Sequence, residues 1–413
     1  MDFVSTSLIT LNQPKGMWEA ILNAFKGGLG SYMYAVILIA VLVRIVFSLV
    51  DIINKKVTMK NSGLMAKMKP ELDAIQKKYG YDQKLMSQKQ NEIYRKYQFN
   101  MMSTCLPMLI TMALQFTVFL TLWTSLQNVA NYNIVKKYED MKNIYANVVA
   151  LNEKTITFAD GDEVKIELNE NKLVFVNETQ NTTEEFEVQN DFTNESVYNM
   201  IHKYVDEGTT ENPNTEYVGT ELSKKLVTIA QNMAEENYLE NQESFLWIKN
   251  IYKAESPTSP LFTEKEVKNY LSKFYSKEEK AIEKEKDYEG KIFNFVVTNG
   301  IGQKKLGSNG YYILTVLAVV VSFLSIWLSN KMMKGVGTAQ NQSKIMYIIM
   351  PVLMGIFTFM YTSLFAVYII VGQLMMMILT PLTTIIVKKW LAHDTAKQKE
   401  KTEVVVDYRR KDM

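Results

Sequence analysis

Cysteine and histidine are almost absent from this 413-residue chain. The single cysteine, Cys105, excludes an internal disulfide and a multi-cysteine metal site. The two histidines, His202 and His393, lie far apart in segments of different character, so no metal site or catalytic triad is indicated. No ATP-binding loop is present either. These absences predict a protein that is not an enzyme and that has neither a metal nor another cofactor.

Charge is distributed very unevenly along the chain, although the formal net charge is only +2. Residues 127–310 contain 32 Asp and Glu, 21 Lys and no Arg. Within this acidic insert, residues 155–158, 164–168 and 172–176 alternate between apolar and polar side chains, which predicts a small antiparallel meander. Residues 195–255 and 263–289 are predicted to be mainly helical. The insert is therefore expected to have an α+β fold.

Long apolar runs determine the class of the protein. Residues 31–52 contain the first run, in which Tyr32 to Val50 are interrupted by one charge, Arg44. A hydrocarbon core of about 30 Å needs roughly 20 apolar residues as a helix, so this run predicts a membrane span. Four further spans follow, and the turn between the last two is predicted at Tyr361-Thr362-Ser363; their ranges are 103–126, 311–329, 345–362 and 364–387. The predicted fold is an α-helical membrane protein with five transmembrane helices.

Arg44 is the first candidate site residue. An arginine near the middle of a span costs about 2.5 to 3.5 kcal/mol on insertion scales, so it usually faces a bundle interior or a water-filled cavity. Alternatively, its side chain reaches the cytoplasmic interface, with Asp51 two turns further along the helix. We expect a cavity, and Thr111 and Gln115 on one face of the second span add a mildly polar stripe that is equally compatible with packing.

A basic segment at residues 53–102 follows the first span. Residues 51–102 hold eleven Lys and Arg against five Asp and Glu, and their apolar positions have helical spacing on both sides of Tyr79-Gly80-Tyr81-Asp82. This pattern predicts a helical hairpin. Its lysines form a candidate binding surface or simply a solvated helix surface; those singled out are Lys67, Lys69, Lys77 and Lys78.

The basic segments together predict the topology. The hairpin, the loop at 330–344 and the tail at 388–413 fall on one side of a five-span chain, which the positive-inside rule places in the cytoplasm. The N-terminus and the acidic insert then lie outside. Residues 1–30 contain an amphipathic helix that suits the membrane interface or an ordinary packing face, and the tail is expected to be disordered.

Several motifs in this order resemble the YidC-type membrane protein insertases. They cover about residues 30–126 and 243–387, while residues 130–240 are an enlargement; the motifs are Leu42-Val43-Arg44, Met68-Lys69-Pro70-Glu71-Leu72, Gln76-Lys77-Lys78-Tyr79, Cys105-Leu106-Pro107, Ser244 to Ile248, Ser256-Pro257, Met350 to Gly355, Ala366-Val367-Tyr368 and Gly372-Gln373. Departures from the usual pattern include Thr111, Ala113 and Gln373.

The resemblance implies a hydrated groove in a bacterial cell membrane, with Arg44, Thr111, Gln115, Tyr368 and Gln373 as its expected polar residues. Such a groove receives hydrophobic segments from the cytoplasm and releases them into lipid. The implied partners are nascent membrane proteins and the lipid bilayer, with the ribosome and the Sec translocon as candidates, and no DNA. Methionines in the last spans suit adaptable substrate contacts or ordinary packing.

Two alternatives remain open at this point. A small-solute transporter or channel would also use polar residues in a bundle, but the chain has no internal repeats. Alternatively, the acidic insert makes this an envelope assembly factor built on an insertase-like core. Deletion of residues 130–240 distinguishes the assembly factor from an insertase. Membrane protein insertion should survive the deletion if the insert is accessory, which is the expected result.

Overall fold

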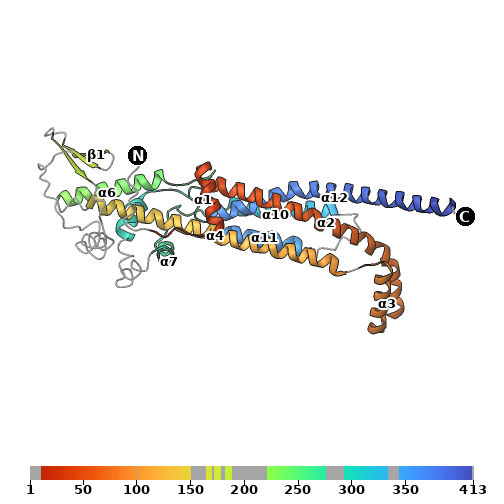
Figure 1. The fold of residues 1–413 in the computed structure, drawn as a ribbon. Helices are drawn as coiled ribbons and strands as arrows, with labels where there is room; N and C mark the ends of the chain where they lie inside the picture. Colours follow the sequence, from red (N-terminus) through yellow and green to blue (C-terminus); the bar gives the residue numbers. More distant parts are fainter. Residues whose placement is uncertain are drawn as a thin grey trace. The chain divides into compact units, whose positions relative to one another are not determined.

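The computed structural model describes residues 11–99, 101–149, 164–169, 172–177, 182–187, 221–275, 293–333 and 344–411 (Figure 1). The chain divides into two compact units. Unit 1 comprises residues 1–19 and 127–311, and unit 2 comprises residues 20–126 and 312–413. Unit 2 contains the apolar helices, and unit 1 contains most of the acidic insert.

Four helices are long and apolar enough to cross a membrane, and a fifth apolar helix is shorter. The helices of unit 2, two of which begin or end in unit 1, are α1 (Met17–Leu29), α2 (Tyr32–Tyr79), α3 (Gln83–Lys96), α4 (Met101–Val149), α10 (Ile313–Met333), α11 (Lys344–Met360) and α12 (Ser363–Lys411). The four long ones are α2, α4, α10 and α12. The turn between α11 and α12 lies where the sequence predicts it.

The predicted hairpin is present, and its first arm is continuous with the first apolar helix. Ser31 caps the start of α2 by accepting a hydrogen bond from the Met33 amide. The helix then continues through the basic segment to Tyr79, where the predicted break begins. Asp82 caps α3, and its carboxylate accepts from the Leu85 amide at 3.0 Å.

Two helices continue beyond their predicted ends. α4 runs to Val149 instead of ending near residue 126, because residues 127–149 lack Gly and Pro and place apolar side chains at helical spacing. α12 extends to Lys411, so the expectation of a disordered tail is wrong. Residues 388–411 contain no Gly or Pro and include six Lys and two Arg, which are good helix formers, so a helix anchored in the bundle can propagate.

Contacts between side chains set the directions of the helices in unit 2. Arg44 of α2 lies against Gly372 of α12, and Lys55 bonds to Thr383, so these two helices run parallel (Figure 1). α10 and α11 run antiparallel, because Tyr312 stacks near Phe359 and Val319 lies against Gly355.

Unit 1 is built on residues 127–149 of α4 and on α6 (Glu221–Glu240). Lys137 lies near the Tyr238 ring, and Tyr145 and Gln231 both lie beside Gly300, so α4 and α6 are antiparallel. A cluster of aromatic rings forms part of the core: Tyr138, Tyr238, Phe262 and Phe293. The shorter elements are α7 (Glu264–Phe274), the π-helical turn η2 (Asn294–Thr298) and the 3-10 turn η3 (Ile301–Gln303).

The insert also contains a three-stranded antiparallel sheet in the order β1-β2-β3. Its strands are β1 (Val164–Asn169), β2 (Lys172–Asn177) and β3 (Thr182–Glu187). Two predicted strands therefore form, whereas residues 155–158 lie outside the described residues and β3 was not predicted. The helical prediction for 241–255 is wrong: this segment is held by side-chain hydrogen bonds, such as those that Asn309 donates to the Asn250 and Ala254 carbonyls.

Candidate functional site

Arg44 is half-buried in unit 2 and lies against the backbone of α12. A Cβ atom added to Gly372 would lie 3.1 Å from Arg44 Nε and 3.2 Å from one of its terminal nitrogens, which is too close for comfortable packing. Glycine therefore gives the guanidinium room beside the helix. No carboxylate among the described residues forms an ion pair with Arg44. Its charge is available to an external group.

A row of polar residues continues from Arg44 toward the hairpin. Ser48, Asp51 and Lys55 follow at spacings of four, three and four residues, which places all of them on one face of α2. Lys55 Nζ donates to Thr383 Oγ1 at 2.6 Å and to the Thr380 carbonyl at 3.3 Å. This face of α2 therefore lies against α12.

Thr111 lies nearer the hairpin end than Arg44 does. Asn54 Nδ2 of α2 donates to Thr111 Oγ1 at 2.7 Å, and that hydroxyl donates to the Pro107 carbonyl at 2.8 Å. Asn54 is ten residues beyond Arg44, or about 15 Å along a helix. Thr111 thus links α2 to α4, and half-buried Gln115 lies one turn further along α4.

The other predicted site residues lie on α12, around Gly372. Tyr368 is buried, stacks near Phe365 with ring centroids 6.2 Å apart, and lies within electrostatic range of Arg44. Gln373 is half-buried and directly follows Gly372. The structure therefore brings Tyr368 and Gln373 to the level of Arg44, whereas Thr111 lies at a different level.

Sequence reasoning missed Gly372, Asn54, Lys55 and Thr383 as members of this polar region. Only the spacing of Arg44 and Lys55 on one helix face was a usable signal. The contacts with α12 join residues more than 300 positions apart, so no local pattern indicates them.

Aromatic rings fill the end of unit 2 that lies opposite the hairpin. Trp123 of α4 approaches Tyr361 with ring centroids 5.1 Å apart, and Phe119 approaches Phe365 at 5.7 Å. Phe357 of α11 stacks near Tyr361. Arg44 lies at a level between this aromatic cluster and the Asn54–Thr111 bond.

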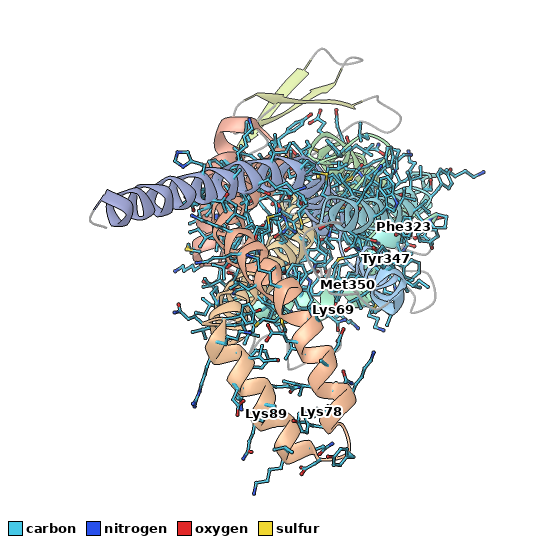
Figure 2. All side chains as sticks on the ribbon, turned by 90° about the vertical axis from the view of Figure 1, so that its right-hand side faces the viewer. Lys69, Lys78, Lys89, Phe323, Tyr347 and Met350 are labelled. Carbon is cyan, nitrogen blue, oxygen red and sulfur yellow. The ribbon has the colours of Figure 1, made fainter. Side chains whose placement is uncertain are left out.

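Apolar side chains of α4 and α11 are extensively exposed. On α4 they are Leu109, Ile110, Met112, Leu114 and Phe116, and on α11 they are Ile348, Ile349, Val352, Leu353 and Ile356. Figure 2 labels two further side chains of α11, Tyr347 and Met350, and Phe323 of α10. A surface of this composition suits contact with lipid tails or with another apolar helix.

The hairpin lysines are all exposed: Lys67, Lys69, Lys77 and Lys78. None of these four forms an ion pair with a described residue. Figure 2 shows Lys78 and Lys89 on the two arms, away from the apolar helices. The hairpin therefore presents cationic groups to solvent.

Glu71 joins the two arms of the hairpin. Its carboxylate accepts hydrogen bonds from Lys96 Nζ at 2.8 Å and from the Tyr97 hydroxyl at 2.7 Å. The bond from Lys96, followed by that from Tyr97, lowers the pKa of Glu71. A lowered pKa stabilises the hairpin above the ordinary Glu pKa, and this contribution is lost as pH falls through the lowered value.

Glu71→Gln is expected to speed amide hydrogen exchange in α3 at neutral pH, because the link between the arms is weakened. The wild-type hairpin should loosen in the same way only when pH falls below the lowered pKa of Glu71. Exchange measured by mass spectrometry in nanodiscs, corrected for intrinsic rates, tests this. Glu92→Gln is the matched control, since Glu92 pairs with Lys89 inside α3. Equal exchange in both variants would contradict a role in joining the arms.

A second contact joins the base of the hairpin to the long end of α12. Lys56 Nζ lies 3.3 Å from the centroid of the Trp390 ring and 2.9 Å from Asp394 Oδ2. A cation–π contact and an ion pair from one ammonium hold the two helices together beyond the apolar segments. Trp390 is the kind of side chain that lies at a membrane interface.

The fold and this site define a multi-pass helical membrane protein with a half-buried arginine among its apolar helices, which forms no ion pair with a described residue. The model of the 60Kd inner membrane protein family matches residues 24–170, which contain α2, α3 and α4. The resemblance to YidC-type insertases that the motifs predict is confirmed by this match and by curated relatives.

Three relatives are each named Membrane protein insertase YidC. The protein of Fusobacterium nucleatum is 29% identical over 99 residues, covering 24% of this chain and 46% of the relative. That of Oleidesulfovibrio alaskensis is 35% identical over 107 residues, covering 26% and 18%. That of Legionella pneumophila is 29% identical over 111 residues, covering 27% and 18%. The chain thus spans less than half of these relatives, and no solved structure matches it.

Proposed function

We propose that this protein is a membrane protein insertase that receives hydrophobic segments from the cytoplasm and releases them laterally into lipid. The observation that carries the proposal is Arg44, a half-buried cation among apolar helices with no ion-pair partner in the described part of the chain. Such a charge is costly in hydrocarbon, so it is expected to be kept where water and a ligand reach it.

The proposed site is a hydrated groove bounded by α2, α4 and α12. Polar groups from Arg44 to Lys55 would hold water along its cytoplasmic half, and the aromatic cluster around Trp123 and Phe365 would close its outer end. A carboxylate in an incoming segment then meets a cation before it meets dry lipid, which offsets part of its desolvation cost. The exposed apolar sides of α4 and α11 offer the segment an apolar path into the bilayer.

The directions of the helices support five spans. Since α2 and α12 run parallel, an odd number of crossings must separate them, and α4, α10 and α11 supply three. α11 has 17 residues, or about 25 Å, which is short for a core of about 30 Å. From five spans and the positive-inside rule, we infer that the N-terminus and the insert at 127–310 lie outside the cell and that the C-terminus lies in the cytoplasm.

The partners follow from the surfaces of this arrangement. The exposed lysines of the hairpin would attract anionic groups of a nascent chain or of the ribosome, and the Sec translocon remains a candidate partner. Hydrophobic partitioning would drive release, aided by membrane potential at about 2.3 kcal/mol per charge per 100 mV. No catalytic step or cofactor is part of the proposal.

Rescue of an insertase-depleted bacterium tests the proposal. The protein should restore insertion of a small membrane protein with an acidic translocated tail, scored by protease access to the tail from outside. Failure of the protein to do so after reaching the membrane would contradict the insertase proposal. Solute flux in vesicles without any effect on insertion would instead support a transporter or channel.

A designed deletion separates the insertase from the envelope assembly factor. Residues 130–145 and 228–240 include buried core residues of unit 1, such as Tyr138 and Tyr238, so the deletion should spare α4 and α6. Replacing residues 150–220 with a short Gly/Ser linker, which the antiparallel α4 and α6 permit, is expected to leave insertion within about twofold of wild type. Deletion of 130–240, which the sequence alone suggested as the test, removes these buried residues; it is therefore expected to lower the amount of folded protein and serves only as the contrasting variant. Loss of insertion in the linker variant at normal abundance would favour the assembly factor.

A further inference from the structure

Two charged residues stand out in the predicted spans. Across residues 31–52, 103–126, 311–329 and 345–387, Arg44 and Asp51 are the only charged side chains. Both lie on α2, seven residues apart, and therefore on the same helix face. The proposed function gives Asp51 no role of its own beyond holding water with the other polar groups of the row.

Asp51 lies between Arg44 and Lys55 on α2, and only Lys55 is hydrogen-bonded to a described residue of α12. Lys55, four residues further along, is held by Thr383 and the Thr380 carbonyl of α12. Arg44 has no ion-pair partner among the described residues, and Asp51, half-buried, likewise forms no ion pair with any of them. The three side chains together carry one net positive charge along the face of α2 that lies against α12.

We propose that Asp51 is a specificity-determining residue that limits how many negative charges a translocated segment carries. This inference rests on the proposed insertase function. A segment that arrives from the hairpin end passes Asp51 before it reaches Arg44. Its first carboxylate is attracted by the net positive charge of the row and neutralises Arg44. Each further carboxylate is then repelled by the Asp51 carboxylate, because no free positive charge remains to offset it.

The substrate class that follows is a segment with few acidic residues in its translocated tail. Neutralising Asp51 raises the charge of the row from one to two positive charges. The variant should then insert tails that carry more acidic residues, while insertion of neutral tails should not change. Asp51→Glu keeps the charge and should behave like wild type.

The experiment measures insertion of one small membrane protein whose translocated tail carries no, one or three aspartates. Proteoliposomes containing the full chain are compared for wild type, Asp51→Asn, Asp51→Ser and Asp51→Glu at equal protein content. The matched control is Asp73→Asn, which removes an exposed acid from the hairpin part of the same helix.

The two neutral variants should raise insertion of the three-aspartate tail by about threefold to tenfold and leave the neutral tail unchanged. An equal effect on all tails, an equal effect of Asp73→Asn, or no effect of both neutral variants would overturn the role of Asp51 while leaving the insertase function standing. If wild type inserts none of the three tails, the proposed function itself fails, and this inference fails with it.

Discussion

Arg44→Ala is expected to reduce insertion of a substrate with an acidic translocated tail by about tenfold or more, a factor that corresponds to only about 1.4 kcal/mol. Two unit charges 4 Å apart interact by about 4 kcal/mol at an effective dielectric constant of 20, so loss of the cation is sufficient for this effect. Arg44→Lys should retain most of the activity, because it keeps the charge. The measurement is rescue of insertion in insertase-depleted cells at equal expression.

Arg95→Ala is the matched control, since Arg95 is an exposed arginine of the hairpin. It should leave insertion nearly unchanged. A substrate with a neutral tail should also be little affected by Arg44→Ala. Full activity of Arg44→Ala with the acidic tail would show that the charge is dispensable, and would shift the mechanism toward groove hydration and the hairpin.

Gly372→Leu is expected to reduce insertion about as much as Arg44→Ala. Even a Cβ atom at this position would lie 3.1 Å from Arg44 Nε, so a leucine side chain must displace the guanidinium or separate α2 from α12. Gly372→Ala should have a smaller effect, because Arg44 is flexible enough to shift slightly. The same rescue assay measures both variants.

A double-mutant cycle shows whether Gly372 acts through Arg44. If it does, Arg44→Ala combined with Gly372→Leu should be no worse than either change alone, because the guanidinium is already gone. Gly28→Leu in α1 is the control, since a Cβ atom added there meets nothing within 4 Å. If the double variant instead loses insertion by the product of the two single-variant factors, Gly372 has no positioning role for Arg44 and its substitution causes a separate packing defect.

The sequence predicted the parts of this fold that depend on local patterns. Apolar runs marked α2, α10 and α12, and the Tyr79–Asp82 break and the turn before Ser363 were found from a few turn residues. Helix ends beyond the apolar runs were missed, because α4 and α12 continue through polar residues that are good helix formers.

Only part of the candidate site was predictable, for a different reason. Arg44 can be recognised from the sequence, because a charged side chain within an apolar span has a high free-energy cost in the membrane. Gly372, Thr383 and Asn54 are ordinary residues for their helices, and their importance comes only from the neighbours that tertiary packing brings to them. Thr111 was expected to be a polar residue of the groove or a packing residue, and in the structure it forms a hydrogen bond between α2 and α4.

The continuity of α2 has a mechanical consequence. No proline interrupts the helix between Arg44 and Lys69, a distance of about 37 Å at the usual rise per residue. A load applied at the base of the hairpin, on the Arg44 side of Pro70, would therefore be transmitted along a continuous helix to the guanidinium. The contacts that Asn54, Lys55 and Lys56 make with α4 and α12 lie next to one another on α2, and the helix would pivot about them. In the proposed insertase, a cargo that docks on the hairpin would therefore affect Arg44 before any part of that cargo enters the bilayer.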